Sequence, residues 1–259
     1  MRFYSCYAFD LDGTLYRGNE GVPGAHEVVA RLESLGARII YVTNNSGLTR
    51  QDYVDKLTSF GFQVSIEQIV TSGNVAAHYC LAHQLSRVFV VGESGLVGTL
   101  RELGVEVVNA DYDGLIGTQT GGAQAVVSGI CRKALSYNLI DSAMQVAMAT
   151  LTYIACNRDM TFPVEQGRFC PGSGAIVAAI EACSGVKAIT VGKPEPAILL
   201  HALAQIGMRP EETLMVGDRM DTDIACGKAA GADTCLVLTG VTQKAVPNQW
   251  CVGSVKDLV

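Results

Sequence analysis

Two carboxylates, Asp10 and Asp12, stand two positions apart at the end of the short apolar segment 4–9, just before Gly13. Such a segment is typical of a buried strand, and residues two apart on an extended chain project to the same side. Because close carboxylates repel each other, a cation or a shared proton has to stabilise them, and a hard divalent metal suits their oxygen ligands. One carboxylate is then left for nucleophilic attack and the other for acid–base work.

Three further polar segments each follow an apolar segment that is predicted to be a strand. Thr43 and Asn44 follow residues 38–42, Lys193 follows 189–191, and Asp218 follows 213–216. In an open parallel sheet the carboxyl ends of the strands share one edge, where ligands bind. We therefore expect these side chains to meet the first carboxylate pair. The set offers carboxylates, a hydroxyl, amides and an ammonium, which suit a metal ion and a tetrahedral oxyanion.

The chemistry that this set favours is transfer of a phosphoryl group, whose transition state carries charge on the equatorial oxygens. Asp10 is expected to be the nucleophile and to form an aspartyl-phosphate. Asp12 is expected to protonate the leaving alcohol and then to activate the water that hydrolyses the intermediate. Asp10, the backbone carbonyl of Asp12 and Asp218 are expected to hold the predicted cofactor, Mg²⁺.

The remaining residues are assigned to the phosphoryl group and to support of the site. Thr43 and Asn44 are expected to donate hydrogen bonds to phosphoryl oxygens, and Lys193 to neutralise the nucleophile and the phosphate. Asp223, at the start of a predicted helix, is expected to support the metal ligands from behind. Arg219 is assigned to substrate binding, with a salt bridge as the alternative.

Strands and helices alternate along the chain, which favours an α/β fold with a parallel, Rossmann-like sheet covered on both faces. Besides the strands already given, residues 88–91, 125–127, 153–156 and 234–238 are predicted strands. Helices are predicted over residues 23–35, 49–60, 72–83, 96–103, 136–149, 174–183, 196–206 and 222–230, with Ser72 as a cap. The Gly-rich stretch 113–122 is predicted to be a loop.

Two short segments in the middle of the chain each allow two interpretations. Residues 157–159, Asn-Arg-Asp, follow a predicted strand and either contribute to substrate recognition or form an ordinary turn. Residues 172–174, Gly-Ser-Gly, either cradle an anion at a helix start or act as a hinge.

Composition narrows the classes of function. A net charge of −6 and a pI near 5.2 disfavour nucleic acid and anionic membranes as partners. No apolar stretch approaches the ~18 residues that span a bilayer, and the chain enters its first strand without room for a signal peptide, so a cytoplasmic protein is expected. Nine scattered cysteines without a Cys-x-x-Cys pair indicate reduced, mostly buried thiols.

At the motifs the chain resembles the haloacid dehalogenase superfamily of phosphatases. The resemblance rests on Asp-x-Asp-Gly-Thr at 10–14, Thr43, Lys193, and Gly-Asp-x-x-x-x-Asp at 217–223. Val-Thr-Asn-Asn-Ser at 42–46 and Val-Gly-Lys-Pro-Glu-Pro at 191–196 are similar to its NagD-like branch. That branch includes para-nitrophenyl phosphatases, pyridoxal phosphatases, phosphoglycolate phosphatases and nucleotide phosphatases.

The resemblance implies a catalytic core with a smaller α/β cap domain inserted between the second and third motifs. We expect the core at residues 1–78 and 186–259 and the cap at 79–185. It also implies a Mg²⁺-dependent phosphatase of small phosphorylated metabolites, and a possible homodimer through the cap. Nucleoside monophosphates, sugar phosphates, phosphoglycolate and pyridoxal phosphate all remain open as the ester.

Two other functions remain open on the same residues. A phosphotransferase or mutase would pass the phosphoryl group from Asp10 to another alcohol. A regulator that binds a phosphometabolite without turnover belongs to a different class, and the intact Asp10, Asp12, Lys193 and Asp218 disfavour it. Haloacid dehalogenation needs no metal, so the carboxylate pair also disfavours that activity.

Overall fold

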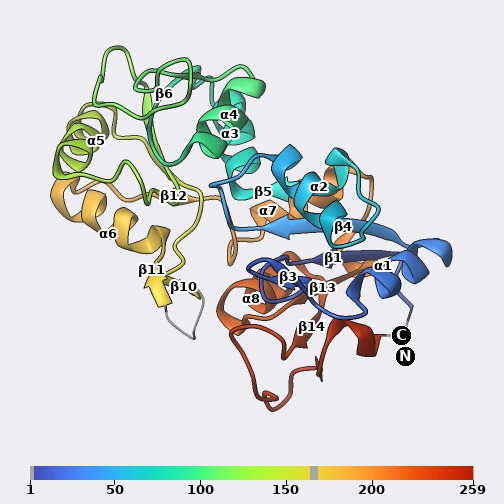
Figure 1. Ribbon diagram of the computed structural model, residues 1–259. Coiled ribbons are helices and arrows are strands. Elements are labelled where there is room, and N and C mark those ends of the chain that lie inside the picture. The colour runs from blue at the N-terminus through green and yellow to red at the C-terminus, as the bar shows by residue number, and fades with distance from the viewer. Residues whose placement is uncertain (1–2, 164–168, 259) are drawn as a thin grey trace. The chain divides into compact units, whose positions relative to one another are not determined.

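The computed structural model describes residues 3–163 and 169–258. The chain forms two compact units. The first unit consists of Met1–Thr43, Arg50–Val70 and Lys193–Val259, and the second of Asn44–Thr49 and Thr71–Gly192. Figure 1 labels the elements of both, and each unit is built around its own sheet.

The sheet of the first unit has six strands in the order β15-β14-β13-β1-β4-β5. These are β1 (Cys6–Phe9), β4 (Arg38–Thr43), β5 (Ile69–Thr71), β13 (Thr213–Gly217), β14 (Asp233–Val237) and β15 (Cys251–Val252). Strand β1 pairs in parallel with both β4 and β13, and Phe9 lies opposite Tyr41 and Val216. The carboxyl ends of these three strands therefore lie at one edge of the sheet.

The central strands of this sheet are apolar on both faces, so both faces have to be shielded from water, and helices cover them. All four residues of β1 and all five of β13 are buried, as a strand between two layers requires. The helices are α1 (Ala25–Ser34), α2 (Arg50–Ser59), α7 (Ala197–Gln205) and α8 (Ala225–Ala230). Short helical turns are η1 (Ile66–Gln68), η3 (Pro210–Glu212), the π-helical turn η4 (Met220–Ile224) and η5 (Val255–Leu258), and β2 (Tyr16–Arg17) pairs with β3 (Glu20–Gly21).

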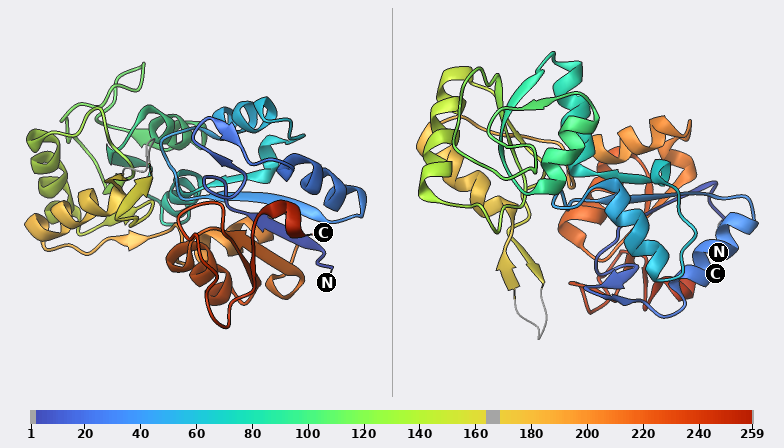
Figure 2. Two further views of the ribbon diagram at one scale, coloured as in Figure 1. Left: turned by 60° about the horizontal axis from the view of Figure 1, so that its bottom comes forward. Right: turned by 45° about the horizontal axis from the view of Figure 1, so that its top comes forward.

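The second unit has a five-stranded sheet in the order β12-β9-β8-β6-β7, with every neighbouring pair parallel. Its strands are β6 (Arg87–Val91), β7 (Glu106–Val107), β8 (Ala125–Ser128), β9 (Tyr153–Ala155) and β12 (Ile189–Thr190). Its helices are α3 (Ser72–Ala82), α4 (Ser94–Glu102), α5 (Tyr137–Thr150) and α6 (Ser173–Ser184). Figure 2 shows the antiparallel hairpin β10 (Thr161–Pro163) and β11 (Phe169–Pro171) extending from this unit.

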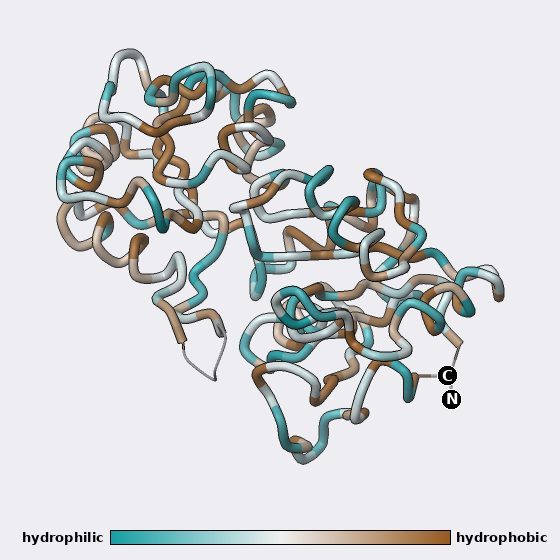
Figure 3. Tube along the Cα trace, in the orientation of Figure 1, coloured by the Kyte–Doolittle hydropathy of each residue, from teal (hydrophilic) through white to brown (hydrophobic). Residues whose placement is uncertain are grey.

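The core of the second unit lies where α5 and α6 pack on the sheet. Phe89, Val126, Tyr153, Leu139 and Val177 are among its buried side chains. In the hydropathy colouring of Figure 3, the segment that Figure 1 labels β6 is apolar. Ser136 caps α5, because its side chain accepts a hydrogen bond from the Leu139 amide at 3.2 Å.

The predicted α/β class with parallel sheets is confirmed, and two local predictions are corrected. The strand predicted at 189–191 exists as β12, but it pairs with β9 in the sheet of the second unit instead of joining β1 and β13. Thr71, not Ser72, caps α3, since the Thr71 hydroxyl accepts from the Asn74 amide at 3.0 Å. The Ser72 hydroxyl instead donates to the Asn44 carbonyl.

Within the described ranges, no helix combines the length and the apolar character needed to cross a membrane. Each of the nine cysteines is a free thiol, and six of them are buried.

Candidate active site

Three buried carboxylates gather at the carboxyl edge of the first unit's sheet. Asp10, Asp218 and Asp223 each offer an oxygen, and these oxygens lie within 4.8 Å of one another. The ammonium of Lys193 lies among them: its Nζ donates to Asp10 Oδ1 at 2.6 Å, to Asp223 Oδ1 at 2.7 Å and to the Val42 carbonyl at 3.0 Å. The fold thus brings together three segments that are far apart in the sequence.

The ends of two adjacent strands place the first two carboxylates. Asp10 directly follows β1, and its amide still donates to the Val216 carbonyl of β13 at 2.8 Å. The Thr14 hydroxyl lies 3.3 Å from Asp10 Oδ2, which explains the hydroxyl residue of the Asp-x-Asp-Gly-Thr motif. Asp218 directly follows β13, which pairs in parallel with β1, so Asp10 and Asp218 stand at the carboxyl ends of adjacent strands.

Asp223 lies in the π-helical turn η4, and π-helical turns are frequent at functional sites. Its Oδ2 accepts from the Arg219 amide at 3.0 Å while its Oδ1 accepts from Lys193. Both oxygens of this carboxylate therefore accept hydrogen bonds from the protein, and these bonds link Lys193 to the segment that contains Arg219.

Burial dominates the electrostatics of this cluster. Burial raises the pKa of Asp10 well above its usual value; Lys193 opposes this shift, whereas Asp223 and Asp218 add to it. The pKa of Asp218 rises to about 7, again mainly through burial and then through the charge of Asp223. Burial alone would lower the pKa of Lys193, but Asp10 and Asp223 outweigh burial and raise it.

The donor set around Asp218 fits a hard divalent cation. Three carboxylates and one ammonium leave an excess of two negative charges when all are ionised, and oxygen donors are the ligands that Mg²⁺ prefers. Two glycines lie against this carboxylate: a Cβ at Gly13 would come within 2.6 Å of Asp218 Oδ2, and a Cβ at Gly240 would collide with it. Any larger residue at either position would crowd the Asp218 oxygens.

Asp12 lies outside the carboxylate cluster. The residue is exposed, but nearby protein atoms displace part of the water around the carboxyl, and this desolvation raises its pKa. The charge of Lys56 lowers the pKa and partly offsets the desolvation. The Lys56 ammonium lies 3.9 Å from the centre of the Tyr16 ring, and Tyr16 forms a β-bridge with Asp12. The cluster concerns side-chain oxygens only, so metal binding by the Asp12 backbone carbonyl stays a prediction.

Thr43 ends β4 and is buried. The hydroxyl of Tyr53, from α2, is hydrogen-bonded to Thr43. Burial raises the pKa of Tyr53, and the nearby charges of Asp12 and Asp10 raise it further. Thr43 therefore lies at the same edge of the sheet as the two aspartates.

Asn44, the next residue, belongs to the second unit. Its carbonyl accepts from Ser72 Oγ at 2.6 Å and from Asn157 Nδ2 at 2.7 Å, and its own Nδ2 donates to Asp159 Oδ1 at 3.0 Å. The contact with residues 157–159 could not be found from the sequence, because no spacing relates positions 44 and 159.

The Arg219 guanidinium forms the salt bridge that was its alternative assignment. Its Nη2 lies 2.7 Å from Asp221 Oδ2 and its Nε lies 3.1 Å from Asp221 Oδ1. Its backbone amide meanwhile donates to Asp223. A substrate contact by Arg219 stays a prediction.

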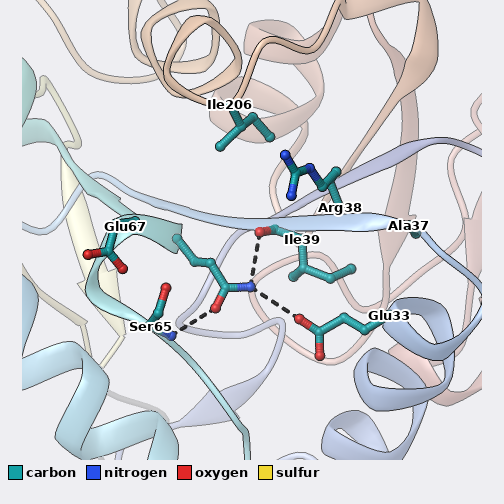
Figure 4. Close-up of a pocket in the computed structure, with 8 residues that line it drawn as sticks. Glu33, Ala37, Arg38, Ile39, Ser65, Glu67 and Ile206 are labelled. Carbon is teal, nitrogen blue, oxygen red and sulfur yellow. Dashed lines mark hydrogen bonds between the residues drawn. The ribbon is translucent and has the colours of Figure 1, made fainter.

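A cavity of about 360 Å³ lies at the opposite, amino end of β4 (Figure 4). Gln68 spans it, donating to Glu33 Oε1 at 3.2 Å and to the Ile39 carbonyl at 3.3 Å and accepting from the Ser65 amide at 2.8 Å. None of the predicted site residues lines this cavity. Gln68 closes the capping box of η1 there.

Comparison with known proteins places these residues in a family. Residues 7–106 match the family described as Haloacid dehalogenase-like hydrolase, and residues 190–256 match one described as HAD-hydrolase-like. The chain is 35% identical to 5'-nucleotidase YutF of Bacillus subtilis over 94% of its own length and 91% of that protein. It is also 35% identical to an acid sugar phosphatase of Staphylococcus aureus, with 93% and 89% covered.

Solved structures give the same result. A p-nitrophenyl phosphatase from Archaeoglobus fulgidus has a TM-score of 0.88 and 34% identity, with 99% of this chain and 98% of that chain covered. NagD from E. coli K-12 has a TM-score of 0.85 and 28% identity, with 99% and 98% covered. A glycerol phosphate phosphatase from Mycobacterium tuberculosis, in complex with magnesium, has a TM-score of 0.84 and 31% identity, with 99% and 76% covered. The chain belongs to the haloacid dehalogenase-like hydrolases.

Proposed function

We propose that this protein is a Mg²⁺-dependent phosphatase that hydrolyses small phosphate monoesters through an aspartyl-phosphate on Asp10. The observation that carries the proposal is the buried cluster of Asp10, Asp218, Asp223 and Lys193 at the end of β1 and β13. The names of the relatives support it, since they include a 5'-nucleotidase, acid sugar phosphatases and p-nitrophenyl phosphatases.

Asp10, Asp218 and the backbone carbonyl of Asp12 would hold the metal ion. When bound, Mg²⁺ supplies positive charge that offsets the carboxylates and the phosphoryl oxygens. Asp223 would keep Lys193 and the segment 219–223 in place, through the hydrogen bonds that it accepts from the Lys193 ammonium and the Arg219 amide. A magnesium complex among the structural neighbours supports this choice of ion.

In the first step, a carboxylate oxygen of Asp10 attacks phosphorus, and the bond from phosphorus to the ester oxygen breaks. Asp12 gives its proton to the leaving alcohol, and a pKa raised by its surroundings favours the protonated form that this step needs. In the second step, Asp12 takes a proton from water, which attacks phosphorus and releases inorganic phosphate and the free Asp10 carboxylate.

Three cationic or hydrogen-bonding groups would hold the phosphoryl oxygens during both steps. Lys193 offsets the charge of Asp10 and of the phosphate, while Thr43 and Asn44 donate hydrogen bonds. Arg219 would contribute through the backbone around it, since its guanidinium pairs with Asp221.

The second unit would act as the cap domain of this enzyme. The predicted cap, residues 79–185, lies inside the segment Thr71–Gly192 of that unit. Closing a cap excludes water and protects the phosphoryl intermediate. A homodimer through the cap and a cytoplasmic location stay predictions.

Substitution of Asp10 tests the proposal. Asp10→Asn keeps the size of the side chain but removes the nucleophile, so turnover of p-nitrophenyl phosphate should fall by at least about 10³-fold. Asp141→Asn, an exposed change on α5, serves as the control and should match the unaltered protein. Phosphate release from nucleoside monophosphates, sugar phosphates, phosphoglycolate and pyridoxal phosphate, with and without Mg²⁺, then identifies the preferred ester. Full turnover by Asp10→Asn would refute the role of Asp10.

The same assays separate the two alternatives. A phosphotransferase would yield a second phosphorylated product in place of inorganic phosphate when an acceptor alcohol is added. A regulator without activity would bind a phosphorylated metabolite and release no phosphate from any ester of the panel.

A further inference from the structure

Asn44, which follows Thr43, is hydrogen-bonded to other residues of the second unit through both its backbone carbonyl and its side-chain amide. Its carbonyl accepts two hydrogen bonds, from Ser72 Oγ at 2.6 Å and from Asn157 Nδ2 at 2.7 Å. Its side-chain Nδ2 lies 3.0 Å from Asp159 Oδ1 and 3.3 Å from Asp159 Oδ2. A carboxylate that accepts an amide hydrogen makes a stronger hydrogen bond than a neutral acceptor does. Asn44 is buried, and all of these partners belong to the second unit.

The turn that supplies these contacts, residues 157–159, is itself held rigidly. Within it, the Asp159 amide donates to Asn157 Oδ1 at 3.1 Å. The amide of Gly174, at the start of α6, donates to the Asp159 carbonyl at 2.9 Å. Arg158 pairs with Glu181 of α6 and donates to Thr190 Oγ1 at 2.8 Å.

Two glycines are required for this close packing. A Cβ at Gly172 would collide with the Asp159 carbonyl oxygen, and a Cβ at Gly174 would come within 2.6 Å of the Arg158 carbonyl oxygen. Residues 172–174 therefore let the start of α6 pack closely on the turn, and both the anion cradle and the hinge considered from the sequence stay predictions.

We infer that Asn157 and Asp159 are positioning residues that orient Asn44 for binding of the substrate's phosphoryl group. This inference rests on the proposed function, because the orientation of Asn44 matters for catalysis only if a phosphoryl group binds beside Thr43. A side chain and a carbonyl that are fixed before the substrate arrives lose less entropy on binding, which favours affinity. The turn at 157–159 is then part of phosphate recognition, although neither Asn157 nor Asp159 needs to touch the phosphate.

The test compares four variants of the full chain with Mg²⁺ present: Asp159→Ala, Asp159→Asn, Asn44→Ala and the double change of both residues to alanine. Asp159→Ala should raise KM for p-nitrophenyl phosphate roughly tenfold and leave kcat within about twofold, because Asn44 binds the phosphoryl group equally in substrate and transition state. The Kd of inorganic phosphate, measured by calorimetry, should rise by the same factor. Asp159→Asn still offers an oxygen to Asn44 Nδ2, so it should recover most of the affinity.

The double variant decides whether Asp159 acts through Asn44. If it does, the double variant should be no worse than Asn44→Ala alone; independent effects would multiply instead and would overturn the inference. Asp141→Ala, an exposed change in the same unit, should leave KM and the phosphate Kd unaltered.

Two further outcomes are decisive. A variant Asp159→Ala that unfolds at lower temperature but keeps KM and the phosphate Kd would show a purely structural role and refute the positioning role alone. An unaltered protein that hydrolyses no phosphate ester would refute the proposed function, and this inference with it.

Discussion

Lys193 shows how the site tolerates a buried charge cluster. Its side chain is 2% exposed, and its Nζ lies within 2.7 Å of two carboxylates, Asp10 and Asp223. Taking such charges out of water is costly, and only close pairing with complete hydrogen bonding offsets the cost. The third bond, to the Val42 carbonyl, completes the ammonium's three donors. The fold therefore needs this cation, whatever its part in the proposed chemistry.

Lys193→Met removes the charge while keeping the length of the side chain. It leaves Asp10 and Asp223 buried without their cation, so the free energy of unfolding should fall by about 3–5 kcal/mol. Turnover of p-nitrophenyl phosphate should fall at least about 100-fold, because the phosphoryl charge also loses its partner. Urea unfolding and initial rates measure the two effects. Lys228→Met, exposed on α8, is the matched control and should change neither; normal stability of Lys193→Met would contradict the pairing argument.

Individual residues of the cluster could be predicted because each stands directly after a short apolar segment. Asp10 and Asp218 follow β1 and β13, which pair with each other in parallel. Lys193 was predicted for a partly wrong reason, since β12 belongs to the other sheet and Lys193 reaches Asp10 from the segment after it. The contact of Asn44 with Asp159 depends on tertiary packing over 115 positions, and no local pattern reports it.

At the scale of the elements, the difficulty lies in short strands. The segment 189–191 has the apolar, β-branched composition of a buried strand, and it does form β12. Two parallel sheets offer the same hydrogen bonds to such a strand, and composition does not distinguish them. The π-helical turn η4 was similarly predicted as the start of an ordinary helix, because a π turn has no sequence signature of its own.

Packing between α6 and the turn at 157–159 can be tested with a single methyl group. Gly172→Ala places a Cβ against the Asp159 carbonyl group and the backbone of Met160, which cannot move aside as a flexible side chain could. The free energy of unfolding should fall by about 1–3 kcal/mol or more. Gly121→Ala, in the same unit, meets nothing within 4 Å and should leave stability nearly unchanged. Equal stability of the two variants would show that the turn has space to move.

For the whole molecule, the sequence predicted two units through the family resemblance and not through composition. No linker rich in proline, glycine or charge separates them. The division follows from contacts instead: it falls directly after Thr43 and directly before Lys193, two of the residues proposed to bind phosphate. The segment Asn44–Thr49 belongs to the second unit although the chain returns to the first at Arg50. Hydrophobic periodicity cannot predict such a division, because the chain passes into the second unit for only six residues before it returns to the first.

Proton uptake by the carboxylate cluster links the stability of the whole chain to pH and metal. The pKa of Asp218 is raised to about 7 and that of Asp10 is raised in the same direction, so both are above their values in the unfolded chain. Between pH 4 and 7 these two carboxyls, without a metal ion, therefore hold more protons in the folded protein than in the unfolded chain. The part of the free energy of unfolding that comes from these two carboxyls should fall as pH rises through this range and level off above it.

A divalent cation reverses that trend, because it binds the deprotonated carboxylates and stabilises only the folded state. Mg²⁺ at about 100 times its Kd should add about 2.7 kcal/mol at pH 8, and EDTA should remove this gain and the phosphatase activity together. At pH 5.5 the gain should be much smaller, since Asp218 is then mostly protonated. Thermal unfolding with EDTA or Mg²⁺ at the two pH values measures the four stabilities, with Asp141→Asn as the control. In Asp218→Asn the gain from Mg²⁺ should vanish at both pH values; a gain of unchanged size would mean that the ion binds elsewhere.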